Sequence, residues 1–480
     1  MPPAPHTPSD PLRTVSRVLL LIGVAGAPWV LGARWHSLAP WGWAAAFCAV
    51  TFAVRAGIWA RDRRGPSLGR AGWALFLMLA GCLVYWWTHD DPSFATRFAA
   101  SHWEFLQGRH PGGVLLVPRG LRLALAASFL LFGLAVADAT RRSGFRDALC
   151  LAMGLSGLAV AAYGAAERWL HWPPPAWLRI ELGGMDQFNG PFFHYSAIAS
   201  AFNMAWPLLA FGGWTARHRR VQQVMIVLLL PITVLLLPIW QAQLAWIICG
   251  LLWALGTLWL VLAFLTPKSS RMIFVALVVG FAGVTAFQAV LVQRLARDFP
   301  DGWQGAERAR VDAPKEDAAL QVRALTRGDR LVASAAPARP VAWLAALRMA
   351  RATGLVGEGP GAWVFQASLY SREPVMKTFF HHRQFAHHDL LQLAAEWGWL
   401  PAAGAVGWMA LAFWCALWRG EGTRVMGIVV ALTGVSLHSL WNFPLQVPAL
   451  QLWFIVLVAA LWGAGHAALS PQRPRETEPV

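Results

Sequence analysis

Blocks of about 20 apolar residues recur along the 480-residue chain and constrain its fold more than any other feature. A run of this length crosses the hydrocarbon core of a bilayer as an α-helix, whereas soluble helical proteins show shorter amphipathic stripes. The composition agrees, because 57% of the residues are hydrophobic and only 13% are charged, against about a quarter in ordinary soluble domains. We therefore predict an all-α polytopic membrane protein with about 12 transmembrane helices.

The apolar runs give the positions of these helices. The predicted spans are 17–34, 37–59, 71–88, 120–139, 147–166, 192–213, 221–240, 243–266, 272–292, 398–417, 425–440 and 447–465. No small-residue cleavage site follows the first run, so we expect a retained helix and not a removed signal peptide.

Short basic clusters between the spans predict the orientation of the chain. They are Arg61, Arg63, Arg64 and Arg70; Arg141, Arg142 and Arg146; Arg217, Arg219 and Arg220; Lys268 and Arg271; Arg419 and Arg424; and Arg473 and Arg475. All of them fall on one side if both termini are cytoplasmic, as the positive-inside rule requires. We expect a multi-pass bacterial inner-membrane protein in contact with membrane lipids. The net charge of +16 has this origin, and because no nucleic-acid-binding motif accompanies it we expect no nucleic-acid partner.

This topology divides the chain into three parts. Residues 1–292 would form helices 1 to 9, residues 293–397 a large periplasmic loop, and residues 398–480 helices 10 to 12 and a cytoplasmic tail. A loop of roughly 100 residues far exceeds an ordinary connection. Its second half has apolar residues at helical spacing over 341–352, which predicts a helix on the bilayer surface that ends at the glycines of 354–361.

The same loop collects most of the groups that could do chemistry. Its ionisable residues are Arg339, Arg348, Arg351, Arg372, Lys377, His381, His382, Arg383, His387, His388, Asp389 and Glu396. Arginine binds phosphate oxygens in bidentate fashion, and histidine can take a proton near neutral pH. A helix beginning near residue 387 would place His388, Gln392 and Glu396 on one face. These groups suit a phosphorylated lipid substrate, although solvated polar side chains at a membrane surface would also explain them.

No metal or cofactor is expected. The histidine pairs 381–382 and 387–388 match no standard zinc-ligand spacing, although zinc stays a lesser alternative. The sequence GEGPG of 357–361 follows an expected helix and not a strand, which argues against a nucleotide site. The five cysteines lie in or beside apolar runs and show no disulfide framework.

Several segments together resemble the O-antigen ligase and polymerase-like superfamily. The loop of that family reads roughly R-x3-W, then G-x-G-x-G-x3-F, then H-N-x-x-L-Q-x-x-x-E-x-G. The matching segments are Arg339 to Trp343, GLVGEGPGAWVF of 354–365 and AHHDLLQLAAEWGWLP of 386–401, with weaker matches at 190–199 and 438–446. The histidine position falls on His387, the glutamine on Gln392 and the glutamate on Glu396.

The resemblance implies a metal-independent glycosyl transfer on the periplasmic face. The donor would be a glycan on undecaprenyl pyrophosphate, and the acceptor lipid A-core, another sugar or a protein. His387 would activate the acceptor hydroxyl, and fixed positive charge would hold the pyrophosphate leaving group. The residues that we expect to bind the substrate are Arg339, Arg348, Arg372, His388, Gln392, Glu396, Gln243 and Asn442.

Two of these positions depart from the pattern of the family. Gln243 stands where the family usually has an arginine, and Asn442 stands where it usually has an aspartate. Neighbouring arginines could replace the missing charge, the substrate could differ, or the activity could be lost. The alternatives are a polymerase of the same superfamily, a transporter, and a non-catalytic component of polysaccharide export. The nearly charge-free spans argue against a transporter.

Overall fold

The computed structural model describes residues 10–32, 39–66, 68–88, 119–170, 191–192, 195–215, 286, 290, 339–370, 385–418 and 422–467. Every regular element within these ranges is a helix, which confirms the predicted all-α class. The long helices are α1 (Pro11–Leu31), α2 (Ala39–Arg61), α3 (Gly69–Thr88), α5 (Arg119–Ala139), α6 (Ser143–Trp169), α7 (Tyr195–Thr215), α18 (Trp399–Trp418), α19 (Gly422–Ser439) and α20 (Pro448–Ala467).

These nine helices coincide with nine of the predicted spans. Within the described ranges, α1, α2, α3, α5, α6 and α20 are long and apolar enough to cross a membrane. The apolar stretches of α7, α18 and α19 are shorter. The spans expected at 221–240, 243–266 and 272–292 lie outside the described residues, as does the first half of the predicted outer loop.

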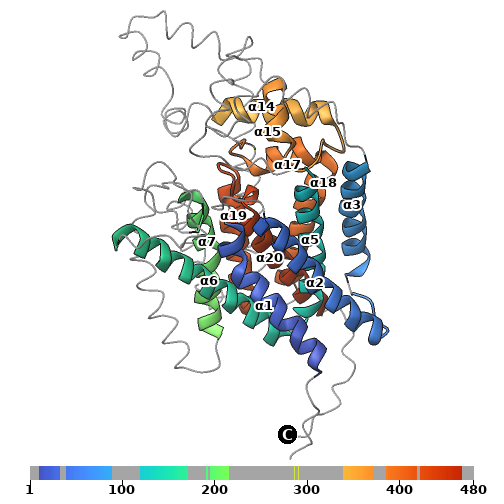
Figure 1. The fold of residues 1–480 in the computed structure, drawn as a ribbon, viewed down its shortest axis with the longest axis vertical. Helices are drawn as coiled ribbons and strands as arrows, with labels where there is room; N and C mark the ends of the chain where they lie inside the picture. The colour runs from blue at the N-terminus through green and yellow to red at the C-terminus, as the bar shows by residue number, and fades with distance from the viewer. Residues whose placement is uncertain are drawn as a thin grey trace, which may run out of the picture.

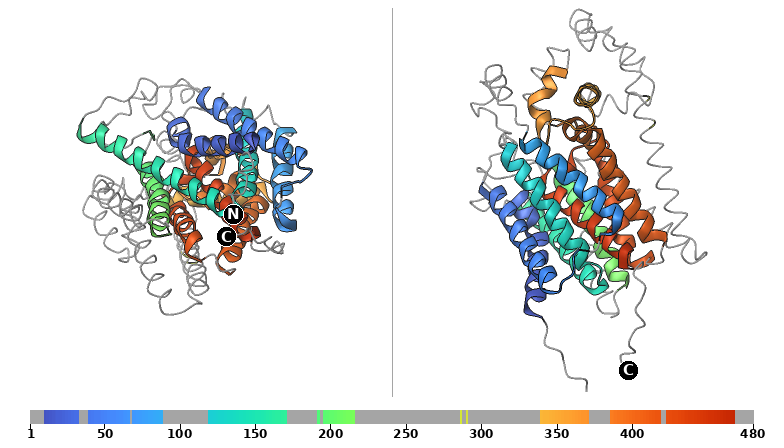
Figure 2. Two further views of the ribbon diagram at one scale, coloured as in Figure 1. Left: turned by 90° about the horizontal axis from the view of Figure 1, so that it is seen from below. Right: turned by 90° about the vertical axis from the view of Figure 1, so that its right-hand side faces the viewer.

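Helix α20 lies near the centre of the bundle, against α5, α18 and α1 (Figures 1 and 2). Two of its tryptophans combine apolar bulk with a hydrogen-bonded indole N–H. Trp453 Nε1 donates to the carbonyl of Val24 at 2.8 Å, and Trp462 Nε1 donates to the carbonyl of Leu68 at 3.1 Å. Both contacts join the C-terminal helix to the N-terminal part of the chain.

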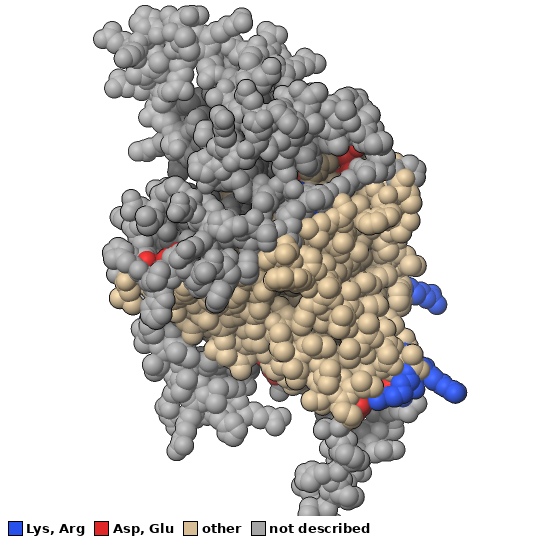
Figure 3. Space-filling view, viewed as in Figure 1, with Lys and Arg blue, Asp and Glu red and all other residues tan. Residues whose placement is uncertain are grey.

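Several basic residues of the N-terminal helices gather at one end of the bundle, where Arg142 lies near Arg13, Arg17 and Arg55. Arg13 at the start of α1 pairs with Asp62 just after α2 at 2.6 Å. Arg55 of α2 donates through Nε to Asp138 Oδ2 of α5 at 2.8 Å, so this arginine within a predicted span has an acidic partner. On the face drawn in Figure 3, the described basic side chains emerge at the lower right and most of the rest is uncharged.

The opposite end of the bundle is covered by three short helices (Figure 1). They are α14 (Arg339–Thr353), α15 (Ala362–Tyr370) and α17 (Asp389–Trp397). Helix α14 confirms the helix predicted over 341–352. It does not lie alone on a surface, because Trp343, Ala346 and Met349 are fully buried and the helix packs against α15 and α17. The short 3₁₀ turn η3 (Pro444–Gln446) links α19 to α20 beneath this layer.

Candidate functional site

Helix α17 begins one or two residues later than the sequence suggests, and this shift decides what His388 does. His388 is the N-cap, and its Nδ1 accepts the backbone N–H of Leu391 at 3.3 Å. Its ring is buried and meets the ring of Trp343 edge-on, with centroids 5.5 Å apart. Burial lowers the pKa of His388 to about 4. His388 is therefore a neutral helix cap, and its contact with the substrate stays a prediction.

His387 has a different environment. Its φ is +54°, in the left-handed region that non-glycine residues seldom adopt. Its carbonyl accepts the indole N–H of Trp343 at 3.2 Å, and its half-buried ring lies edge-on to Phe443, with centroids 4.9 Å apart. The two adjacent histidine rings thus contact different parts of the molecule, His388 the α14 side and His387 the loop after α19.

Gln392 and Glu396 lie together on one face of α17, as their spacing predicts. Gln392 Nε2 donates to Glu396 Oε1 at 3.1 Å. The Glu396 carboxylate also accepts the backbone N–H groups of Gly361 at 2.9 Å and Trp363 at 3.3 Å, at the start of α15. Burial raises the pKa of Glu396, while these bonds and nearby Arg122 act in the opposite direction. Both side chains therefore help to hold α15 against α17.

The glycine-rich segment after α14 wraps around the C-terminal end of α17. Gly359 donates its N–H to the carbonyl of Glu396 at 2.7 Å. A Cβ on Gly357 would lie 2.3 Å from that same carbonyl oxygen, so a side chain there would clash with backbone. Trp86, at the end of α3, donates its indole N–H to the carbonyl of Gly357 at 2.7 Å. The segment thus fastens the short helices to the bundle and does not form a phosphate loop.

The loop after α19 carries a buried polar chain. Asn442 Oδ1 accepts the N–H of Phe443 at 3.1 Å, which turns its amide NH₂ toward His438 Nε2 at 3.2 Å. That contact assigns the proton of the His438 ring to Nδ1, which lies 2.6 Å from Ser200 Oγ. Ser200 in turn donates to the carbonyl of Ser196 at 2.9 Å. Asn442 thus positions His438 and lies beside Phe443, which packs against His387.

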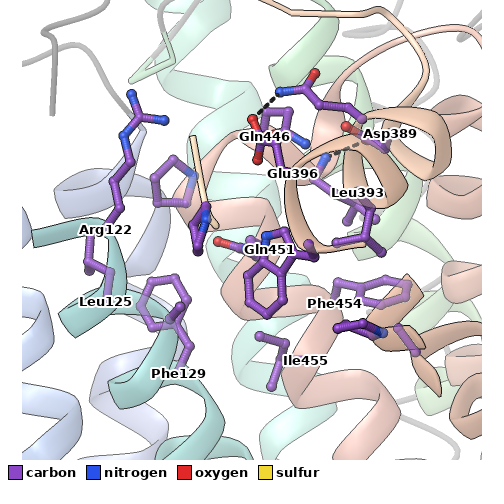
Figure 4. Close-up of a pocket in the computed structure, with 18 of the residues that line it drawn as sticks. Arg122, Leu125, Phe129, Asp389, Leu393, Glu396, Gln446, Gln451, Phe454 and Ile455 are labelled. Atoms are coloured by element: carbon purple, nitrogen blue, oxygen red, sulfur yellow. Dashed lines mark hydrogen bonds between the residues drawn. The ribbon is translucent and has the colours of Figure 1, made fainter. Parts of the chain in front are cut away.

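A cavity of about 220 Å³ lies between the short helices and the bundle. Its polar end is formed by Arg122 of α5, Asp389, Gln392 and Glu396 of α17, Gln446 of η3, and Gln451 of α20. Its apolar part runs along α3, α5, α18 and α20. The residues there include Leu79, Leu83, Leu125, Phe129, Trp408, Phe454, Ile455 and Val458. Figure 4 shows Arg122 across from the acidic side chains of α17, with Phe129 and Ile455 below them.

Two cavity residues, Arg122 and Asp389, were not among the predicted site residues. Arg122 packs so closely on Gly361 that a Cβ at that glycine would lie 2.0 Å from the guanidinium. The sequence does contain a signal, because Arg122 lies at the end of its span opposite to the other basic clusters, against the positive-inside trend. Asp389 was seen only as one of many ionisable residues in the outer loop.

The structure describes only some of the remaining predicted site residues. Arg348 is half-buried on α14, and its guanidinium donates to the carbonyl of Tyr370 at 3.4 Å. Arg339 begins α14, and only its backbone is described. Arg372 and Gln243 lie outside the described residues. Within the described ranges, no three His, Cys, Asp or Glu side chains converge as a metal site would require.

Comparison with known proteins gives no relative, since no family model matches the sequence and no curated protein is significantly similar to it.

Proposed function

We propose that this protein transfers a glycan from an undecaprenyl-pyrophosphate carrier to an acceptor at the periplasmic face of the bacterial inner membrane. The observation that carries the proposal is the two-part cavity, with Arg122 and amide groups at one end and an apolar channel along the helices at the other. A lipid with a phosphorylated head has this same division. The head would lie against the short helices, and the first isoprene units would lie along α5 and α20.

The position of the cavity agrees with the topology that the charges predict. Its polar end lies under α14, α15 and α17, away from the basic end marked by Arg13 and Arg142. If the basic end is cytoplasmic, the cavity opens near the periplasmic surface. The glycan of a lipid carrier is presented there, and acceptors of the outer envelope are accessible from that side.

The chemistry requires a base, a bound leaving group and a shielded site. The acceptor oxygen attacks the anomeric carbon, its proton passes to a base, and the bond from that carbon to the pyrophosphate oxygen breaks with its electron pair. His387 is the base that the sequence predicts. It lies outside the cavity lining, but Phe385 and Asp389 on either side of it contribute to that lining. Arg122 is added to the residues that would hold the pyrophosphate.

The test is glycan transfer by purified protein in detergent, supplied with undecaprenyl-pyrophosphate-linked oligosaccharide and with lipid A-core or free oligosaccharide as the acceptor. Leu125→Trp, which fills the apolar part of the cavity, should abolish transfer. The control is Leu77→Trp on α3, where the side chain is 62% exposed on the outer surface of the bundle.

Product length would separate a ligase from a polymerase. Movement of labelled donor across liposomes without any glycosidic product would instead support a transporter, and it would overturn the proposal.

A further inference from the structure

The polar end of the cavity presents an apparent contradiction for an anionic ligand. Two carboxyl groups, Asp389 and Glu396, line the region in which a pyrophosphate would bind. Two negative charges there would repel it. Environments that separate the protonation states of two neighbouring carboxyl groups are a recognised way of giving them different roles. The two residues have different contacts.

Glu396 is held as an acceptor. Its two oxygens receive three hydrogen bonds, from the backbone of Gly361 and Trp363 and from the side chain of Gln392, and Arg122 lies close enough to interact electrostatically. The backbone donors come from the N-terminal end of α15, where negative charge is favoured. Glu396 is thus committed to contacts within the protein.

Asp389 is also buried, and its Oδ1 has no hydrogen-bond partner among the described residues. Its Oδ2 accepts the backbone N–H of Leu445 at 2.8 Å. The other polar groups that face it are Ser439 of α19, Gln446 of η3 and, on its own helix, Glu396. Ser439 donates its hydroxyl to the carbonyl of Val435 at 2.9 Å. Burial raises the pKa of Asp389 to about 8, even though Leu445, Ser439 and Gln446 favour the charged form and only Glu396 adds to the rise.

We propose that Asp389 meets the ligand as a neutral carboxylic acid, and that its O–H donates a hydrogen bond to the phosphate oxygen on which negative charge develops. This inference rests on the proposed function, because it names a further ligand-binding residue of the same site. Oδ2 keeps its bond from Leu445, and Oδ1 carries the proton. The polar end of the cavity then offers the Asp389 hydroxyl and the Arg122 guanidinium as donors on opposite sides of the space (Figure 4).

In the reaction, Asp389 stabilises the pyrophosphate leaving group. As the bond from the anomeric carbon to the pyrophosphate oxygen breaks, the electron pair stays on that oxygen. The Asp389 hydroxyl and the Arg122 guanidinium both donate to the departing anion, while the proton of the acceptor passes to the base. Asp389 keeps its own proton throughout and needs no further reactant.

The first test measures binding of undecaprenyl pyrophosphate without a glycan, by native mass spectrometry at several pH values. Above about pH 8 Asp389 loses its proton, so affinity should fall about tenfold from pH 7 to pH 9. Asp389→Asn keeps an acceptor for Leu445 and a donor toward the cavity, so it should bind as tightly as the wild type at pH 7. The affinity of Asp389→Asn should also no longer fall above pH 8. Asp389→Ala should bind at least tenfold more weakly at pH 7.

Undecaprenol, which lacks phosphate, is the matched ligand control and should bind equally at both pH values. Glu358→Gln, an exposed side chain of the same glycine-rich segment, is the protein control and should keep the wild-type pH profile. Thermal unfolding of each variant shows whether it is folded. If Asp389→Asn binds tenfold more weakly than the wild type at pH 7, the carboxylate itself is required and the inference fails.

A measurement without ligand tests the protonation state directly. Dicyclohexylcarbodiimide reacts with protonated carboxyl groups in apolar surroundings, and peptide mass spectrometry locates the adduct. Asp389 should be modified at pH 7 and progressively less above pH 8, whereas no modification at pH 7 would contradict the neutral acid. Absence of glycan transfer by the wild type, with pH-dependent lipid binding intact, would refute the proposed function and leave only the ligand-binding role of Asp389 standing.

Discussion

The Glu396 carboxylate accepts the backbone N–H of Gly361, 35 residues away in the chain, at 2.9 Å, and this bond joins α17 to the start of α15. The same carboxylate holds Trp363 and Gln392. A glutamate that the family resemblance suggests for the substrate thus has a structural role in this fold, at the edge of the cavity. The role explains why a helix as short as α17 keeps a fixed position.

Replacing this glutamate should destabilise the protein. Glu396→Ala leaves two backbone N–H groups and one amide buried without an acceptor, so the free energy of unfolding should fall by about 3 kcal/mol. Glu396→Gln keeps one acceptor oxygen and should cost less. Thermal unfolding in detergent measures both, and Glu358→Ala on the exposed side of the same segment should leave the midpoint unchanged. An unchanged midpoint in Glu396→Ala would show that α15 and α17 are held by other contacts.

His388 should make the protein sensitive to acid. Its pKa is about 4 in the folded state and near 6.5 when exposed. Between these values the unfolded chain binds more protons, so the contribution of His388 is complete above pH 6.5 and is lost as the pH falls toward 4. His388→Asn keeps an N-cap acceptor without a titrating group. Lowering the pH from 7.5 to 5 should therefore lower the unfolding midpoint of the wild type more than that of His388→Asn. A difference in midpoint that does not change with pH would contradict a buried, neutral His388.

Sequence reasoning located the helices well, because the physical signal is simple. Uncharged runs of about 20 residues have few structural options, and α3 and α20 begin and end within about two residues of the predicted spans. Helix α14 was also predicted, from its apolar spacing and the glycines that follow. Helix α15 was not predicted, because Ala362–Tyr370 has no clear amphipathic pattern. Its first turn is also stabilised by a hydrogen bond to the carboxylate of Glu396, which is distant in the sequence.

The candidate site could be predicted only in part. The pair Gln392 and Glu396 follows from helical spacing, and their contact confirms it. The boundary of α17 could not be fixed as closely, and a shift of one or two residues makes His388 the N-cap of the helix. Arg122 and Asp389 line the same cavity because separate helices converge there. That convergence depends on tertiary packing, which no local pattern in the sequence encodes.

The orientation of the chain can be tested with two exposed positions. Gly65 follows α2 and has open space around its Cα, and Glu358 lies in the glycine-rich segment at the opposite end of the bundle. In a background without the native cysteines, Glu358→Cys should react with an impermeant maleimide in intact spheroplasts. Gly65→Cys should react only after the membrane is permeabilised, because the basic end is expected to be cytoplasmic. If instead Gly65→Cys reacted in intact spheroplasts and Glu358→Cys only after permeabilisation, the topology would be the reverse of the predicted one and the cavity would lie at the cytoplasmic face.

The last prediction concerns His387 as the base that takes the proton of the acceptor. Its backbone φ of +54° calls for a replacement that tolerates this conformation, and asparagine does so better than most residues. His387→Asn should therefore keep the turn and the Trp343 contact to its carbonyl, while it loses the group that accepts a proton. Glycan transfer should fall by roughly a hundredfold to ten-thousandfold, and His387→Gln and His387→Ala should be similarly slow.

His388→Asn is the matched control, because it alters the neighbouring ring and keeps the cap. It should retain most of the activity at pH 7. Binding of undecaprenyl pyrophosphate should be unchanged in His387→Asn, since the ring faces Phe443 and not the cavity. Transfer by His387→Asn at the wild-type rate would remove His387 from the reaction. If binding and transfer fell together instead, His387 would act on the donor and not on the acceptor.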